Sequence, residues 1–196
     1  PTFSSVKPIV NYPLSIINCQ LSIVHCALLI LCCLLFGGKA WGQAIADYVV
    51  TKTTGISYSS IYSSGTSVAT TSDVSLADES NHQIPLDFDF PFGNKTISAG
   101  TKIHVHADGC IGFGIDVSNG TTTGDYDQIS PIGVDLNPVS SNYTGTKDIR
   151  WLKTGTSPNQ VMTIEWYNVP TYYSPYYVMN VQLKLYENGN IEFIYG

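Results

Sequence analysis

The stretch that decides the fold is Met179-Asn-Val-Gln-Leu-Lys-Leu-Tyr-Glu-Asn-Gly-Asn-Ile-Glu-Phe-Ile-Tyr195. From Met179 to Tyr186 apolar and polar residues alternate. This alternation places every second side chain on the same face of a half-buried strand. Asn188-Gly189 is typical of the tight turn that joins two antiparallel strands. The stretch therefore predicts a hairpin whose return strand runs from Ile191 to Tyr195.

The same alternation recurs upstream of this hairpin. It predicts strands over 84–90, 102–107, 110–113, 131–136, 149–153 and 161–166. Asp108-Gly109 predicts a two-residue hairpin turn between the second and third of these strands. No segment after residue 43 has a helical period. Many short strands separated by Gly, Asn and Pro favour an all-β fold, an antiparallel, jelly-roll-like β-sandwich.

The chain stops at Gly196, directly after a predicted strand. An apolar strand at the edge of a sheet is prone to pair with other chains. We therefore expect further strands downstream, so that residues 43–196 form a sandwich domain that is incomplete at its C-terminal end.

Residues 1–42 have a different character. Ala27 to Phe36 is an apolar run, and the small residues Ala40 and Gly42 precede Gln43. This pattern predicts a signal peptide that is cut before Gln43, preceded by an upstream segment that starts without methionine. A membrane anchor is the alternative, but a span needs about 18–20 apolar residues. We expect no stable membrane span in the mature form.

Composition excludes one class of partner. The 196 residues carry nine Lys and Arg against fifteen Asp and Glu, which gives a net charge of −6. A chain so poor in cations is unsuited to neutralising phosphates, so we expect no nucleic acid partner. Cys110 would be the one cysteine left after cleavage, and its apolar neighbours predict a small buried residue rather than a nucleophile.

Several motifs occur in an order that resembles a known family. They are Phe88-Asp-Phe-Pro-Phe-Gly93, the 103–114 hairpin, Ile129-Ser-Pro-Ile-Gly-Val-Asp-Leu136, Val161-Met-Thr-Ile-Glu-Trp-Tyr-Asn-Val169 and the 181–196 hairpin. This order resembles a β-sandwich module of secreted Bacteroidetes proteins and the extracellular nidogen-type domain of adhesion proteins. The resemblance implies a secreted or cell-surface protein, with a type IX sorting tail in longer relatives. It supplies no catalytic residues.

Three sets of polar residues are candidates for chemistry. His104 and His106 share a strand face and could bind a transition metal, with His82 as a third ligand. Asp116, Asp125 and Asp127, together with Asn119, could supply oxygen ligands to a structural calcium ion. Asp87 and Asp89 lie about 7 Å apart on one strand face, near the separation of a glycosidase pair. Ordinary solvated side chains are the alternative for all three sets.

Tyrosines dominate the connection before the last hairpin. Tyr172, Tyr173, Tyr176 and Tyr177 flank Pro175 in a predicted loop. Exposed tyrosine rings are rigid contacts with a polar tip, suited to sugar rings or to a protein partner. Packing of half of these rings over the sandwich edge is the alternative.

These patterns favour a non-enzymatic, cell-surface or secreted module for adhesion or structural spacing. Its partner would be an extracellular protein or glycan, and it would need no cofactor. The second hypothesis is a carbohydrate-binding module of a larger secreted hydrolase. The third is a metal-dependent hydrolase that uses His104 and His106.

Overall fold

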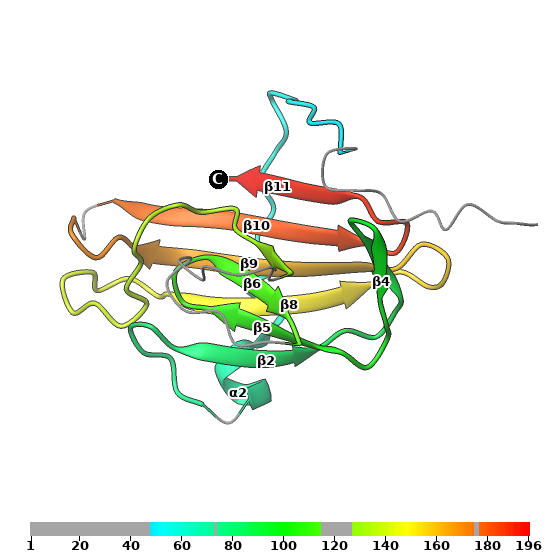
Figure 1. Ribbon diagram of the computed structural model, residues 1–196. Helices are drawn as coiled ribbons and strands as arrows, with labels where there is room; N and C mark the ends of the chain where they lie inside the picture. The colour runs from blue at the N-terminus through cyan, green and yellow to red at the C-terminus, as the bar shows by residue number, and fades with distance from the viewer. Residues whose placement is uncertain (1–47, 73, 115–126, 175–176) are drawn as a thin grey trace, which may run out of the picture. The chain divides into compact units, whose positions relative to one another are not determined.

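The structure, a computed structural model, describes residues 48–72, 74–114, 127–174 and 177–196. These residues belong to one compact unit, Gly42–Gly196. Figure 1 shows them as β-sheets that face one another, and all strand pairs are antiparallel. The predicted antiparallel β-sandwich is confirmed. The predicted upstream segment and signal peptide lie outside the described residues, as do Asp116, Asp125 and Tyr176.

The larger sheet has five strands in the order β1-β8-β9-β10-β11. They are β1 (Thr66–Ser67), β8 (Asp148–Thr154), β9 (Val161–Pro170), β10 (Val178–Tyr186) and β11 (Ile191–Tyr195). β9 and β10 pair along most of their length, with a bulge between Met179 and Val181. The hairpin predicted from the last stretch of sequence is thus β10 and β11, with Leu185 opposite Ile191.

The smaller sheet has four strands in the order β2-β5-β6-β7. They are β2 (Asn81–Pro85), β5 (Lys102–His106), β6 (Cys110–Phe113) and β7 (Gln128–Ile129). A separate ribbon consists of β3 (Phe90–Phe92) and β4 (Lys95–Ile97), and α2 (Val68–Ser72) is a five-residue helix. Within the described residues, no helix is both long and apolar enough to cross a bilayer.

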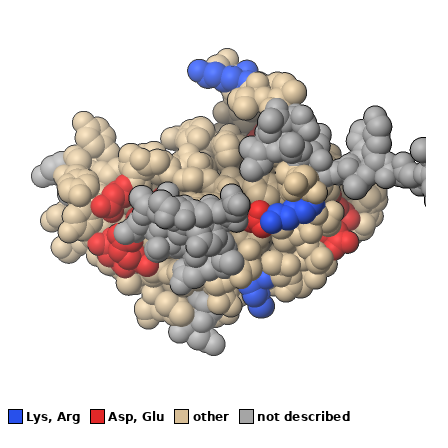
Figure 2. All heavy atoms as spheres, in the orientation of Figure 1, with Lys and Arg blue, Asp and Glu red and all other residues tan. Residues whose placement is uncertain are grey.

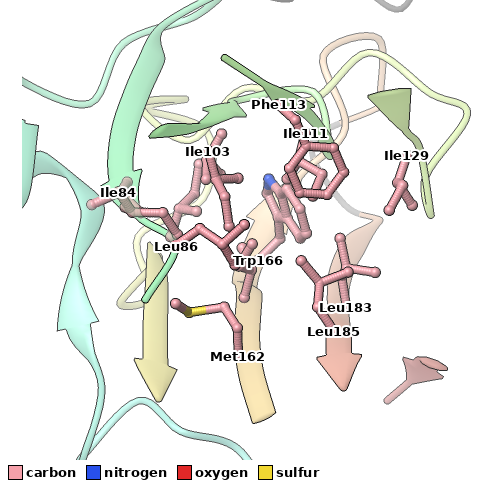
Figure 3. Packing of buried hydrophobic residues seen from close by; sticks show 14 of the residues in the cluster. Ile84, Leu86, Ile103, Ile111, Phe113, Ile129, Met162, Trp166, Leu183 and Leu185 are labelled. Carbon is pink, nitrogen blue, oxygen red and sulfur yellow. The ribbon is translucent and has the colours of Figure 1, made fainter. Parts of the chain in front are cut away.

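Both sheets contribute to a single apolar core. Trp166 of β9 is fully buried, and Figure 3 shows it among Ile103 and Ile111 of the smaller sheet and Leu183 of β10. Its indole Nε1 donates a hydrogen bond to the carbonyl oxygen of His106 at 3.0 Å. A buried indole N–H needs such an acceptor. This one contact ties the centre of the larger sheet to the end of β5.

The outer face of the larger sheet is covered as well. Tyr58 to Ile61, a segment without regular structure, lies over the side chains of Glu165 on β9 and Gln182 on β10. Glu165 is fully buried there and accepts four hydrogen bonds, from Tyr58 Oη (2.6 Å), Ser60 Oγ (3.0 Å), the Ile61 amide (3.2 Å) and Gln182 Nε2 (2.8 Å). A buried carboxylate needs donors of this kind, because leaving it unpaired is costly.

Two predictions of local structure are wrong. The helix α2 does not contradict the lack of a helical period after residue 43, because five residues are too few to show one. Residues 131–136 form no strand, and Leu136 makes only an isolated bridge to Thr171. The Asp108-Gly109 hairpin has three residues between the paired His106 and Cys110, with Gly109 at φ 79°. A glycine with positive φ is typical of such three-residue loops.

The predicted strand over 84–90 is divided. β2 ends at Pro85, and β3 begins at Phe90 and pairs with β4 rather than with β5. The burial alternation nevertheless holds throughout, because Ile84, Leu86, Phe88 and Phe90 are all buried while Asp87 and Asp89 are exposed. Alternation of apolar residues therefore predicts which side chains face the core. It does not predict the partner strand, which changes from β5 for β2 to β4 for β3.

Candidate functional site

A pocket of about 350 Å³ lies where β5 ends and the segment after β7 begins. It is lined by Glu79, Asp108, Cys110, Ser130, Ile132, Gly133, Val134 and Asp135. The described residues that line it include three acids and no Lys or Arg. Figure 2 shows acidic side chains gathered toward the left end of the visible face. We call the pocket lined by these eight residues the acidic pocket.

Two of the acids that line this pocket, Glu79 and Asp135, lie close to a third carboxylate, that of Asp78. One oxygen each of Asp78, Glu79 and Asp135 lies within 4.8 Å of the other two. The Oδ1 atoms of Asp78 and Asp135 are buried and accept no hydrogen bond from the part of the chain that the structure describes. Partial burial raises the pKa of all three groups, and the nearby charge of Asp108 raises each of them further. The arrangement favours anything that neutralises negative charge, either protons or a cation.

His106 stands beside this cluster but has its own partners. Its side chain is 1% exposed, and Nε2 lies 3.8 Å from a Glu79 carboxylate oxygen. Its Nδ1 accepts a hydrogen bond from the Asp108 amide at 3.2 Å. When Nδ1 accepts, the neutral ring carries its proton on Nε2. The Nε2–H group therefore faces Glu79 as a donor, and His106 offers no free lone pair to a metal.

The segment 130–136 forms the wall of the acidic pocket without strand pairing along it. Asp108 Oδ1 accepts from the Leu136 amide at 3.0 Å, and Tyr195 Oη donates to the Pro131 carbonyl at 2.9 Å. Gly109 lies so close to Ile132 that a Cβ atom there would be 2.6 Å from its side chain. The wall is thus held from the β5–β6 turn and from β11.

The predicted metal ligands are not brought together. His104 Nδ1 is hydrogen-bonded to Asn81 Oδ1 at 3.1 Å. His82 lies opposite Val105 in the ladder, and directly opposed residues share a sheet face. His82 therefore faces the core, where Ser80 Oγ contacts it at 2.8 Å and burial lowers its pKa. It is on the other side of the sheet from His104 and His106 and cannot complete a site with them.

The other acids proposed from the sequence have local partners. Asp127 forms an ion pair with Lys95, away from the acidic pocket lining. Asp87 pairs with Lys153 at 3.1 Å, and Asp89 Oδ1 accepts from the Ala99 amide at 2.8 Å. Separate partners of this kind stabilise turns and strands and do not assemble a glycosidase pair.

The predicted tyrosine loop adjoins the acidic pocket. Tyr172, Tyr173 and Tyr177 are 50%, 85% and 69% exposed. The Tyr172 amide donates to the Asp135 carbonyl at 2.9 Å, and the Thr171 amide to the Tyr177 carbonyl at 3.0 Å. These bonds fix the backbone while the rings stay outside. Tyr172 and Tyr173 meet edge to face, with ring centroids 5.2 Å apart and planes at 80°.

Sequence reasoning missed Asp78, Glu79, Asp108 and Asp135 as a group. They come from the segment before β2, the β5–β6 turn and the segment after β7. No spacing within the sequence joins them, because antiparallel pairing of β2 with β5 brings the start of one beside the end of the other. The one available signal was at Asp108, which directly follows the predicted strand 102–107. Asp135 lies within the predicted strand 131–136, and Asp78 and Glu79 lie at least five residues before the predicted strand 84–90.

Fold and site together define an antiparallel β-sandwich module that carries exposed rings and acids in the connections at one end. A family model described as NIDO related (nidogen related) matches residues 47–196, more than half of the chain. The chain therefore belongs to the nidogen-related family. Domains of this family are non-catalytic modules, and membership indicates an extracellular location. Comparison with curated proteins and with solved structures found no match.

Proposed function

We propose that this protein is a non-enzymatic adhesion module that contacts an extracellular protein through Tyr172, Tyr173 and Tyr177. The observation that carries the proposal is the exposure of three tyrosine rings on a loop with a hydrogen-bonded backbone. Backbone that is hydrogen-bonded at Thr171, Tyr172 and Tyr177 loses less conformational entropy on binding, and aromatic anchors supply much of the energy of protein interfaces. Family membership supports the extracellular setting.

The geometry of the rings favours a protein over a glycan. A sugar ring stacks on a flat aromatic face, whereas Tyr172 and Tyr173 stand at 80° to each other and present no common plane. Crossed rings instead form a ridge that fits between side chains of a partner. The carbohydrate-binding hypothesis remains the alternative. Secretion in a Bacteroidetes host by the type IX route is part of the same proposal, by resemblance.

The test measures retention of the 196-residue chain on immobilised extracellular matrix extract. Tyr173→Ala and Tyr177→Ala should each weaken binding at least about tenfold, which corresponds to about 1.4 kcal/mol. Phe193→Ala is the matched control, because Phe193 is an exposed aromatic residue on β11, outside the tyrosine loop. It should leave retention unchanged.

Periodate treatment of the extract separates the two partner classes, because it oxidises sugar diols and leaves most protein surfaces intact. Retention that survives periodate and is lost in the tyrosine variants supports the protein partner. Retention lost after periodate supports the carbohydrate alternative. If wild-type protein is not retained on either surface, or if Phe193→Ala lowers retention equally, the tyrosine loop is not the contact surface.

A further inference from the structure

The acidic pocket has buried carboxylate oxygens that need a hydrogen-bond donor or a cation. The side chains of Asp78 and Asp135 are half-buried, but their Oδ1 atoms are buried, and no described residue donates a hydrogen bond to either atom. Buried carboxylate oxygens are costly unless a donor or a cation meets them. Both residues belong to the same group of three carboxylates, together with Glu79, so their charges also repel one another. Two unpaired buried atoms that share one cluster point to a bound positive charge.

The donor chemistry narrows the choice of cation. The three groups of this cluster offer carboxylate oxygens only. His106, the nearby imidazole, has Nδ1 engaged by the Asp108 amide, so it is not available as a nitrogen ligand. Sets of oxygen ligands suit hard cations such as Ca²⁺ and Mg²⁺ rather than zinc or copper.

The number of carboxylates favours calcium over magnesium, because Mg²⁺ loses its water reluctantly and is usually held by one or two carboxylates, whereas Ca²⁺ accepts more oxygen ligands in a flexible geometry. Ligands on opposite sides of a Ca²⁺ ion at about 2.4 Å are about 4.8 Å apart. The oxygens of Asp78, Glu79 and Asp135 all lie within 4.8 Å of one another, so one calcium sphere can hold them. Magnesium requires a tighter octahedron at about 2.1 Å. The pocket of about 350 Å³ leaves room for the water molecules that would complete the coordination.

We propose that Asp78, Glu79 and Asp135 bind one Ca²⁺ ion in the acidic pocket. The ion joins the segment before β2 to the pocket wall at 130–136, two parts of the chain without ladder pairing to each other. Asp108 and His106 border the site: Asp108 adds negative charge, and its Oδ1 holds the Leu136 amide. The proposal stands independently of the tyrosine contact, because it concerns other residues and another ligand.

The test is calorimetric titration of the 196-residue chain, stripped with EDTA and dialysed, with CaCl₂ alone. Extracellular calcium modules bind with a Kd of about 10⁻⁴ to 10⁻³ M. We expect one site in that range and a rise in Tm of about 5 °C at about 5 mM calcium, well above the Kd. The same concentration of MgCl₂ should give less than half of this rise.

Two isosteric variants locate the site. Asp78→Asn and Asp135→Asn each remove one charged ligand and should weaken calcium binding at least about tenfold, with loss of most of the Tm rise. Asp87→Asn is the control, because Asp87 pairs with Lys153 at the surface. It should titrate like the wild type. Two variants are used so that failure of one to fold leaves the other as the test.

Two results would overturn the proposal. One is a wild-type chain that shows neither heat nor a Tm shift up to about 5 mM calcium, about five times the weakest Kd expected of such modules. That result would mean that protons, not a metal, neutralise the three acids. The other is an equal loss of calcium response in Asp87→Asn, which would indicate diffuse attraction to a chain of net charge −6.

Discussion

At the scale of single residues, Glu165 shows how this fold handles a buried charge. All four groups that donate to its carboxylate are uncharged. Hydrogen bonds alone can solvate a buried anion when enough of them converge, and each bond to a charged group contributes about 1.5–3 kcal/mol. Burial and the bond to Glu165 raise the pKa of Tyr58, so its hydroxyl stays protonated and remains a donor throughout the physiological range.

Replacing Glu165 by leucine should be far more damaging than replacing it by glutamine. Glu165→Leu leaves the Tyr58 hydroxyl, the Ile61 amide and the Gln182 amide without their acceptor. Each unsatisfied buried donor costs about 1–3 kcal/mol, so a loss of at least about 3 kcal/mol in the free energy of unfolding is expected. Glu165→Gln keeps one carbonyl acceptor and should lose about 1 kcal/mol. Urea denaturation measures both, and equal losses would contradict this account.

Asp135 should make stability depend on pH in the direction opposite to a salt-bridged acid. Burial raises its folded-state pKa above the ordinary value of 3.8. The folded state then binds the proton more tightly, so its contribution to the free energy of unfolding is lost as pH rises through the raised pKa. Asp135→Asn removes this titration. In EDTA, its stability relative to wild type should improve from about pH 3.5 to pH 7.

Urea denaturation at several pH values provides the comparison. His82, whose pKa is lowered by burial, titrates in both proteins and cancels in the difference. A difference between the two proteins that does not change with pH would show that the Asp135 carboxylate is not strained by its neighbours.

At the scale of elements, the β5–β6 turn depends on Gly109. Its φ of 79° and a Cβ position 2.6 Å from Ile132 both disfavour any side chain. Gly109→Ala should therefore lower the free energy of unfolding by about 1–3 kcal/mol through overpacking and backbone strain. Gly133 lies in the same pocket wall with open space around its Cβ position, so Gly133→Ala is the matched control. It should change stability by less than about 0.5 kcal/mol, measured by thermal unfolding.

Elements with strict alternation and full pairing were predictable. β8, β9, β10 and β11 fall on the predicted strands because one face of each is buried against the core. Residues 131–136 were predicted as a strand because Ile132 and Leu136 are apolar, and both are indeed buried. Their backbone is held by Asp108 and Tyr195 instead of a neighbouring strand. The spacing of apolar residues does not predict whether the backbone of residues 131–136 is hydrogen-bonded by a neighbouring strand or by side chains.

The candidate site was predictable only in part. The tyrosine loop could be predicted from composition. Of its two alternatives, exposed rings or rings packed over the sandwich edge, the exposure of Tyr172, Tyr173 and Tyr177 agrees with the first. His106 was proposed as a ligand beside His104, but it borders Glu79 and Asp108 instead. Asp108 reaches Leu136 across 28 residues of sequence. Such long-range proximity comes from strand pairing, which a single sequence does not specify.

At the scale of the whole described unit, the two sheets share one core and should unfold together. Leu183 of β10 is fully buried in the same cluster as Ile103 of β5. Leu183→Ala should lower the free energy of unfolding by about 2–5 kcal/mol. Amide hydrogen exchange in β5 and β10 should accelerate by the same factor, because both exchange through one global opening. Acceleration confined to β10 would show that the sheets unfold separately.

The segment from Tyr58 to Ile61, which covers Glu165, also implies an order of folding steps. Tyr58 and Glu165 are 107 residues apart, and Gln182 is 123 residues from Ser59. Tyr58 to Ile61 have no surface to dock on until β9 and β10 have paired, since their acceptors and donors come from both strands. Contacts this distant in sequence form slowly. We therefore expect Tyr58 to Ile61 to dock after β9 and β10 have paired, with the Glu165 carboxylate hydrated on an open sheet until then.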